Sequence, residues 1–458
     1  MSDVRSDPEH LLGSAPAPTH PRSFRRALGC IFCGAEYEIP EHAEDPRLAG
    51  GLSCPRPACV ARHRGIYGSL EVVFDYDRLR DAVDVVSLLR GPARSLWDYA
   101  PLLPAPARVT LGEGATPLLA APRLRGEIGL VDVWLKNEGS NPTGSFKDRE
   151  SAVAVARALE VGATGVTCVS SGNAAASLAA YAARAGLRCL VFTPAGASIG
   201  KRTFVAYMGA RGIGVDGAFE DVWELVHRDP ARDLAVGPYL SRHWYDANPA
   251  LNPYRSEGDK TTAYEIVVEH GRVPDWVFVP VGNGSHLVGL WKGFRELREL
   301  GVTTSAPRMV GVQVYDADPV TRAWKEGADH SLRVERPADS LAEGTVAKDS
   351  YDAPRALAAI RESSGRMASA FEGDTLDTMF ALARREGILT EPTSATVLAA
   401  GKEMVDEGLI ARTDDVVFVL TGNGLKTMET LVERKLGDRV ARLYATVVEP
   451  GGEAEPAR

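Results

Sequence analysis

Short apolar runs, each followed by a helical pattern, recur along most of this chain from about residue 111. The apolar runs lie at residues 131–135, 166–170, 187–192, 276–281, 309–314 and 416–420, and the clearest helical patterns at 148–160, 174–185 and up to residue 300. Strands that are apolar throughout are buried on both faces, and their alternation with helices is typical of parallel sheets covered by helices on both sides. The pattern therefore predicts an α/β fold built on open parallel sheets.

The length and charge of the chain narrow this class further. The 458 residues exceed one ordinary domain, and the 45% of hydrophobic and 25% of charged residues are typical of a globular protein. A net charge of −9 argues against nucleic acid or an anionic membrane as a partner. The chain has no apolar run long enough for a membrane span and no secretory pattern at its start. We therefore expect a cytoplasmic protein.

Four of the six cysteines form two close pairs near the N-terminus, Cys30 with Cys33 and Cys54 with Cys59. Cysteine pairs in a reducing compartment favour a metal over disulfides, and four thiolates suit tetrahedral zinc. We expect residues 29–75 to form a small ribbon around a structural zinc ion. A ribbon that packs without metal remains the alternative.

A nine-residue string, Asn-Pro-Thr-Gly-Ser-Phe-Lys-Asp-Arg at 141–149, places Lys147 where a helix begins. The start of a helix disfavours positive charge, which favours a neutral amine. A neutral amine is what imine formation with an aldehyde requires. The string therefore predicts a lysine that reacts with a carbonyl group.

Three further turns follow predicted strands, where ligands of open α/β sheets bind. Ser171, Gly172 and Asn173 open a helix whose free N–H groups suit a carboxylate. The loop Gly-Asn-Gly-Ser-His at 282–286 suits a phosphate, because its glycines allow close backbone approach and a helix follows. Thr421 stands in a fourth turn, where its hydroxyl could bond a ring nitrogen.

Taken in this order, the four turns resemble those of the threonine-synthase branch of the fold-type-II pyridoxal-phosphate (PLP) enzymes. Further strings that resemble this family lie at 111–118, 251–258 and 386–392, and the cysteine ribbon and residues 96–99 resemble its N-terminal extension. The resemblance covers roughly residues 29–430. It implies a fold like that of tryptophan synthase β, with two open parallel-sheet domains and an N-terminal zinc-ribbon-like segment. The expected divisions are a disordered tail at 1–28, the ribbon at 29–75, a connecting segment at 76–110, a large PLP domain at 111–147 and 266–448, a small domain at 148–265, and a tail at 449–458.

The resemblance also implies roles for individual residues. Lys147 would hold PLP covalently and move protons at three substrate carbons. The other cofactor contacts would be Phe146, Asn173, Gly282, Asn283, Gly284, Ser285, His286 and Thr421. Ser171, Gly172 and the N–H of Ala174 would hold the substrate carboxylate, and Arg255 would face a substrate phosphate.

The chain departs from the family pattern around that phosphate. Ala174 and Ala250 stand where the family usually has hydroxyl residues, and Glu150 replaces a glycine after the lysine string. The glycine loop ends in Ser285-His286 instead of Gly-Asn, and Asn423 replaces a histidine. A hydrogen bond to a charged group contributes about 1.5–3 kcal/mol, so the loss of two hydroxyls could weaken phosphate binding about a hundredfold. Ordinary drift and a changed leaving group or nucleophile both explain these departures.

By resemblance, the expected activity is a PLP-dependent lyase that converts O-phospho-L-homoserine and water to L-threonine and phosphate. One alternative is a paralogue that performs β- or γ-elimination or replacement on another amino acid in specialised metabolism. A second alternative, from a different class, is a non-catalytic PLP-binding regulatory protein. We expect a small-molecule amino-acid substrate, no nucleic-acid or membrane partner, and, by fold analogy, a homodimer.

Overall fold

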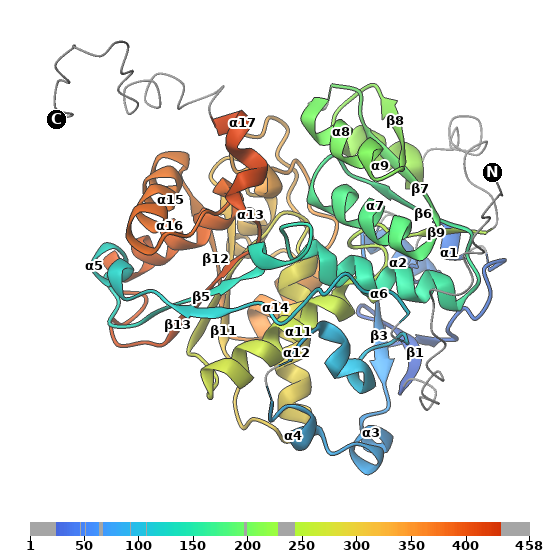
Figure 1. Ribbon diagram of the computed structural model, residues 1–458, viewed down its shortest axis with the longest axis horizontal. Helices are drawn as coiled ribbons and strands as arrows, with labels where there is room; N and C mark the ends of the chain where they lie inside the picture. Colours follow the sequence, from blue (N-terminus) through green and yellow to red (C-terminus); the bar gives the residue numbers. More distant parts are fainter. Residues whose placement is uncertain are drawn as a thin grey trace, which may run out of the picture.

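Three sheets organise the computed structural model of the chain (Figure 1). The structure describes residues 24–431 apart from 46, 51, 64–66, 92, 107, 197–198 and 228–242. The predicted tail at 449–458 and most of the tail at 1–28 therefore lie outside the described residues. Two of the sheets are open and largely parallel, as the apolar runs predicted.

The largest sheet has six strands in the order β12-β11-β10-β13-β5-β4. Its strands are β4 (Leu118–Ala120), β5 (Val133–Asn137), β10 (Trp276–Pro280), β11 (Arg308–Val314), β12 (Arg366–Ala370) and β13 (Val416–Leu420). All neighbouring pairs are parallel except β4 with β5, and Trp276 of β10 pairs with Val416 of β13. The carboxyl ends of β10 and β13, from which two of the predicted turns emerge, therefore lie side by side.

Both faces of the large sheet are buried, because successive side chains of each strand point to opposite sides. In β13, Val417 and Val419 pack on one core, while Phe418 and Leu420 pack on the other. The first core is completed by α11 (Pro253–His270), α12 (Ser285–Glu299), α13 (Pro319–Lys325) and α14 (Ala353–Glu362). The second is completed by α5 (Arg125–Ile128), α15 (Glu372–Glu386) and α16 (Pro392–Asp406), which Figure 1 shows on the left.

The second open sheet has four parallel strands in the order β8-β7-β6-β9. They are β6 (Gly165–Val169), β7 (Arg188–Pro194), β8 (Arg211–Val215) and β9 (Trp244–Asp246), and the helices of this region are α6 (Lys147–Glu160), α7 (Asn173–Ala185), α8 (Ile199–Tyr207) and α9 (Phe219–His227). The sequence did not predict β8 or β9. The turn before α7 emerges from the carboxyl end of β6, as expected.

The N-terminal ribbon is a small antiparallel sheet in the order β2-β1-β3. It consists of β1 (Arg25–Cys30), β2 (Glu36–Tyr37) and β3 (Leu70–Phe74), with α1 (Arg47–Gly50) and α2 (Pro57–His63). The predicted boundary of the N-terminal tail at residue 28 is wrong, because Phe24 and Leu28 are buried and β1 begins at Arg25. The remaining short elements are α3 (Tyr76–Ala82), α4 (Val85–Leu88), η2 (Leu96–Leu102), η3 (Pro122–Leu124), η4 (Glu138–Ser140), η6 (Glu343–Thr345), η7 (Gly424–Thr427) and α17 (Met428–Leu431).

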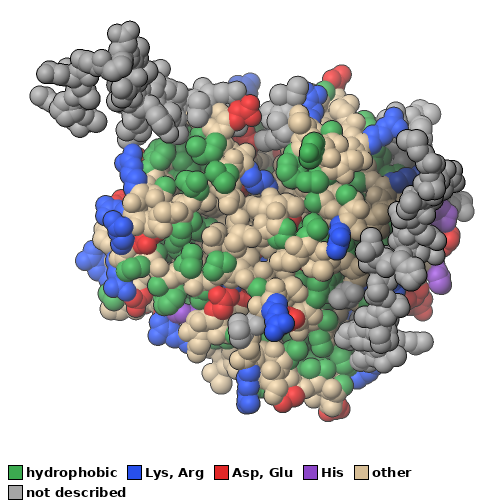
Figure 2. Space-filling view, viewed as in Figure 1, with side chains coloured by type: hydrophobic (Ala, Val, Ile, Leu, Met, Phe, Trp, Pro, Cys, Tyr) green, Lys and Arg blue, Asp and Glu red, His purple; other side chains and the backbone are tan. Residues whose placement is uncertain are grey.

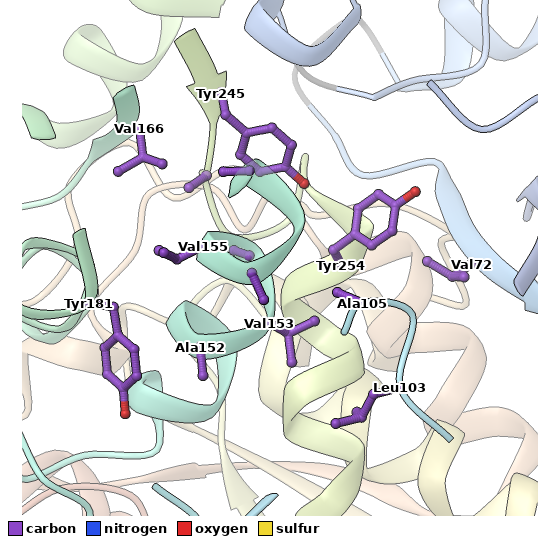
Figure 3. Close-up of a cluster of buried hydrophobic side chains, with 14 of the residues drawn as sticks. Val72, Leu103, Ala105, Ala152, Val153, Val155, Val166, Tyr181, Tyr245 and Tyr254 are labelled. Carbon is purple, nitrogen blue, oxygen red and sulfur yellow. The ribbon is translucent and has the colours of Figure 1, made fainter. Parts of the chain in front are cut away.

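Helix α6 runs through a core that the ribbon shares with the four-stranded sheet (Figure 3). Val153 and Val155 of this helix lie among Val166, Tyr254 and Val72, which come from β6, α11 and β3. Eleven consecutive residues of α6, from Asp148 to Ala158, are buried. This burial fixes the helix that begins at Lys147.

Charged side chains of both signs are interspersed on the face drawn in Figure 2. Among the described residues, no helix is both long enough and apolar enough to cross a membrane.

Candidate functional site

Lys147 is the first residue of α6, directly after the turn of its string. The N–H and the hydroxyl of Thr143 donate to the two oxygens of Asp148, at 2.6 Å each, and hold this turn together. The N–H of Phe146 donates to the carbonyl of Thr421 at 3.1 Å. The lysine string therefore lies against the turn that follows β13.

The Lys147 amine has close neighbours on its own helix and on α12. Its Nζ lies 2.7 Å from Oε1 of Glu150, 3.5 Å from Oγ of Ser285 and 4.2 Å from the centroid of the Phe146 ring. The structure thus joins the lysine string to the glycine-rich loop, as the sequence predicted.

Glu150 is fully buried and also binds Arg255, the residue expected to face a substrate phosphate. Nε and Nη2 of Arg255 donate to Oε2 of Glu150 at 2.9 and 2.6 Å, and Nη1 donates to the carbonyl of Ala247 at 2.9 Å. Burial would raise the pKa of Glu150, but the positive charges of Lys147 and Arg255 lower it to about 2. Glu150 is therefore ionised, and Arg255 already holds an anion.

The glycine-rich loop connects β10 to α12 with little space around it. A Cβ on Gly282 would collide with the carbonyl of Gly344, and Gly284 has a φ of 109°, which favours glycine. The hydroxyl of Ser350 donates to the Gly282 carbonyl at 2.6 Å, and the N–H of Tyr351 donates to Oδ1 of Asn283 at 3.2 Å. These contacts fix a tight turn at the start of a helix.

His286 lies beneath the lysine string as a buried, neutral ring. It stacks on Phe146 with ring centroids 3.9 Å apart and an interplanar angle of 10°. Burial lowers the pKa of His286 to about 3, so the ring carries no charge at neutral pH.

The Ser-Gly-Asn turn approaches the site through Asn173. Gly172 caps α7, and its N–H donates to Oγ of Ser170 at 3.1 Å. Nδ2 of Asn173 donates to the two carboxylate oxygens of Glu391 at 3.0 and 3.2 Å, and the N–H of Glu391 donates to the carbonyl of Gly422 at 3.0 Å. Glu391 thus links the four-stranded sheet to the turn after β13.

Thr421 lies in that turn, with its Oγ1 3.0 Å from Oγ of Ser394. Oγ of Ser394 also accepts the N–H of Gly422 at 2.9 Å. The sequence did not assign a role to Ser394 or Glu391, although Glu391 lies within the supporting string at 386–392 and Ser394 follows it closely. The available signal was the Glu-Pro pair at the start of α16, since a proline is common at the first position of a helix.

The two alanines at departure positions lie close to these turns. Ala174, the second residue of α7, is buried. Ala250 has a φ of 74°, and its carbonyl accepts Nη2 of Arg355 at 3.1 Å. Neither side chain offers a hydrogen bond.

Arg149, two residues after Lys147, forms buried ion pairs next to the site. This fully buried side chain binds Glu138 and Glu265, with nitrogen–oxygen distances of 2.8 and 2.6 Å. A buried charge is stable only when it is paired and hydrogen-bonded in this way. The network fixes α6 against α11.

The residues around Lys147 fit the PLP that the resemblance implies. Both ring nitrogens of His286 and the hydroxyl of Ser145 are buried without a hydrogen-bond partner among the described residues. Buried polar atoms normally have partners, so these atoms fit a polar group bound beside them. The first turn of α12 adds N–H groups without intrahelical partners, which suit a phosphate.

The four ribbon cysteines also come together, with all four Sγ atoms within 4.8 Å of one another. The Sγ atoms of Cys30 and Cys59 are 3.8 Å apart, and those of Cys33 and Cys54 are 3.9 Å apart. A tetrahedron with Zn–S bonds of about 2.3 Å has S···S edges of about 3.8 Å. The cluster therefore has the dimensions of a zinc site.

Comparisons with known proteins agree with this geometry. A family described as "Pyridoxal-phosphate dependent enzyme" matches residues 109–422. The threonine synthase of Methanocaldococcus jannaschii is 36% identical over 408 residues, which cover 88% of this chain and 93% of that protein. The threonine synthase of Mycobacterium tuberculosis is 40% identical over 330 residues, which cover 71% and 85%.

A solved structure, the threonine deaminase of T.th., is 27% identical with a TM-score of 0.55 and covers 67% of this chain and 92% of that one. The predicted fold class is thereby confirmed, because sheets, turns and comparisons agree. The chain belongs to the pyridoxal-phosphate dependent enzymes and, among them, to the threonine synthase family.

Proposed function

We propose that this enzyme converts O-phospho-L-homoserine and water to L-threonine and phosphate. The observation that carries the proposal is the contact of the lysine string with the glycine-rich loop and with the turn after β13, to which Glu391 links Asn173. The relatives of this chain at 36 and 40% identity are threonine synthases. The substrate is accordingly a small amino acid.

The chain's own residues provide the site for the cofactor and the proton transfers. PLP, when bound, withdraws electrons from the substrate and so acidifies its carbon-bound protons. The Lys147 amine holds the cofactor and then takes up and returns protons at Cα, Cβ and Cγ. Phe146 and Asn173 would lie beside the cofactor ring. The phosphate would be held by Gly282, Asn283, Gly284, Ser285 and His286, and Thr421 would face the ring nitrogen.

The amino acid is bound at the opposite side of the site. Its carboxylate lies at the start of α7, where Ser171, Gly172 and the N–H of Ala174 supply donors. Arg255 lies on the side of the leaving group, and Glu150 is hydrogen-bonded to it there.

The ribbon holds a structural zinc ion through Cys30, Cys33, Cys54 and Cys59. The S···S distances and the absence of a disulfide among the described cysteines support this assignment. Four thiolates close the coordination sphere, so this ion has no open position for chemistry.

The remaining parts of the proposal concern the setting of the enzyme. It acts in the cytoplasm as a homodimer, without a nucleic-acid or membrane partner. The net charge of −9 and the mixed charges on the face in Figure 2 support the expectation that no nucleic acid or anionic membrane is a partner.

A second candidate, elimination or replacement on another amino acid, is favoured by one observation. Nε and Nη2 of Arg255 already donate to Glu150, so they are not available to a substrate phosphate unless Glu150 is displaced.

One NMR time course tests these proposals. PLP-loaded protein is mixed with O-phospho-L-homoserine, and phosphate and the threonine methyl signal are followed together. Equal rise of both supports the proposed function, whereas phosphate without threonine supports a diverted elimination. No reaction, with PLP still bound through Lys147, contradicts the proposed function. Lys147→Ala should abolish both product formation and the cofactor's absorption band, while Lys402→Ala, on the exposed side of α16, should change neither.

A further inference from the structure

Glu150 is a buried carboxylate one helical turn after Lys147, and both of its oxygens are used. Oε1 lies 2.7 Å from Nζ of Lys147 and accepts the Ser285 hydroxyl at 2.8 Å. Oε2 accepts two bonds from Arg255. Glu150 therefore joins the lysine, the glycine-rich loop and α11 at one point.

The bond between Glu150 and Arg255 occupies the edge of the guanidinium that an oxyanion would use. Nε and Nη2 form the planar fork that binds carboxylate or phosphate through two parallel bonds. The third nitrogen, Nη1, donates to the carbonyl of Ala247 at 2.9 Å. A substrate phosphate must therefore displace a carboxylate before it gains this fork.

Asp259, one turn after Arg255 on α11, adds a second carboxyl group beside Glu150. It is fully buried, and no donor among the described residues reaches either of its oxygens. Burial and the charge of Glu150 raise the pKa of Asp259 well above its ordinary value, which favours the protonated form beside the charged Glu150. The carboxylate of Glu150 thus accepts from Lys147, Ser285 and Arg255, with a second carboxyl group close by.

Close packing keeps Glu150 in this place. A Cβ on Gly258 would collide with the carbonyl of Arg149, the residue before Glu150, and a Cβ on Gly289 would collide with Asp259. Helices α6, α11 and α12 are therefore in contact at this level. Glu150 has little room to turn away when a ligand arrives.

We propose that Glu150 determines which leaving group the enzyme prefers. Its carboxylate neutralises Arg255, lowers the affinity of the site for a phosphate dianion, and favours γ-substituents that carry less charge, such as acyl esters of L-homoserine. The inference rests on the proposed function, because it places the γ-substituent beside Lys147. The neutral pair replaces a free cation as the neighbour of the leaving group.

The corresponding reaction of O-acetyl-L-homoserine balances with water alone. The Cγ–O bond breaks, and its electron pair leaves on acetate. The substrate gives up protons at Cα and Cβ, which Lys147 returns at Cγ and Cα, and water adds its hydroxyl at Cβ and releases a proton to solvent. The products are L-threonine, acetate and that proton.

The test compares wild type with Glu150→Gln, which keeps the shape of the side chain and removes its charge. In PLP-loaded protein, calorimetry measures the dissociation constant of the phosphonate isostere of O-phospho-L-homoserine, in which a methylene replaces the bridging oxygen. We expect Glu150→Gln to bind it about tenfold more tightly or better, because Arg255 regains its charge for the ligand. The ratio of kcat/KM for the acetyl ester to kcat/KM for the phosphate ester should fall by a similar factor.

Glu160→Gln is the matched control, since Glu160 also pairs with arginine on α6 but lies at its other end. It should leave both readouts unchanged. Equal dissociation constants in wild type and Glu150→Gln overturn the proposal, even if wild type makes threonine. Tighter binding by Glu150→Gln supports it, even if wild type makes no threonine and the proposed function fails.

If Glu150→Gln does not fold, wild type alone decides the question. We expect it to bind the phosphonate no more than about tenfold more tightly than an uncharged ester isostere, because Arg255 is neutralised. A preference of about a hundredfold or more for the phosphonate contradicts the proposal.

Discussion

The charge states of three groups near Lys147 are governed by shifted pKa values. The charges of Lys147 and Arg255 lower the pKa of Glu150, burial lowers that of His286, and burial with the charge of Glu150 raises that of Asp259. Each state depends on neighbours from another helix. The charges at this site are therefore set by tertiary packing.

The neutral state of His286 predicts a loss of stability in acid. Its pKa is lowered to about 3 in the folded protein, against about 6.5 in an unfolded chain. As pH falls below about 6.5, the unfolded chain takes up a proton that the folded chain does not, so stability is present above this pH and lost below it. At pH 5 the loss is about 2 kcal/mol.

Urea unfolding of the cofactor-free protein at about pH 7.5 and pH 5 measures this loss. His286→Gln should lose about 2 kcal/mol less than wild type between these two conditions. The exposed His330→Gln should behave as wild type. An equal loss in all three proteins would mean that His286 is protonated in the fold.

At this scale the sequence predicted the residue types of the site better than their partners. Lys147, Asn173 and Thr421 stood in strings whose chemistry could be interpreted locally. The partnership of Glu150 with Arg255 could not be predicted, because it depends on how α6 lies against α11, 105 residues along the chain.

In the two open sheets, the strands that escaped prediction are short or lie at sheet edges. β8 contains two glycines in five residues and β12 has three partly exposed positions, so neither forms the apolar run of a central strand. β4 and β9 have three residues each. The central strands β6, β7, β10, β11 and β13 are buried on both faces, which is why their sequences predicted them.

The contact between α6 and α11 predicts a cost for adding one methyl group. Gly258→Ala would favour the helix by about 1 kcal/mol, but its Cβ collides with backbone at Arg149. Because backbone cannot yield as a side chain does, we expect a net loss of about 1–3 kcal/mol in the free energy of unfolding.

Urea titration of the two glycine variants checks this prediction. Gly373→Ala, in the first turn of α15, has no atom within 4 Å of the added Cβ and should be neutral or slightly stabilising. An unchanged stability of Gly258→Ala would mean that α6 and α11 can separate without cost.

Across the whole molecule, the cysteine ribbon belongs to the same core as α6. Cys54 and Cys59 pack in one cluster with Val153 of α6 and Val166 of β6. If the ribbon requires zinc, the loss of zinc should destabilise α6 and β6 as well as the ribbon. The sequence predicted the ribbon but not this shared core, because its members lie about a hundred residues apart in the sequence.

Metal analysis and thermal unfolding test that coupling. Wild type should hold one zinc ion per chain, and Cys54→Ser should lose it and unfold at a lower temperature. Cys168→Ala removes a buried thiol of β6 and should retain the metal. Wild type without zinc but with unchanged thermal stability would favour the metal-free ribbon.

The segments that form the core around α6 are synthesised at different times. The ribbon and residues 96–105 leave the ribosome before α6, so the side chains of one wall of the core are available when the lysine helix emerges. Helix α11, with Arg255 and Tyr254, arrives about a hundred residues later and closes the opposite wall. A nascent chain that stalls before α11 therefore presents Lys147 on an incompletely buried helix. The surroundings of the Lys147 amine are complete only after α11 has been synthesised.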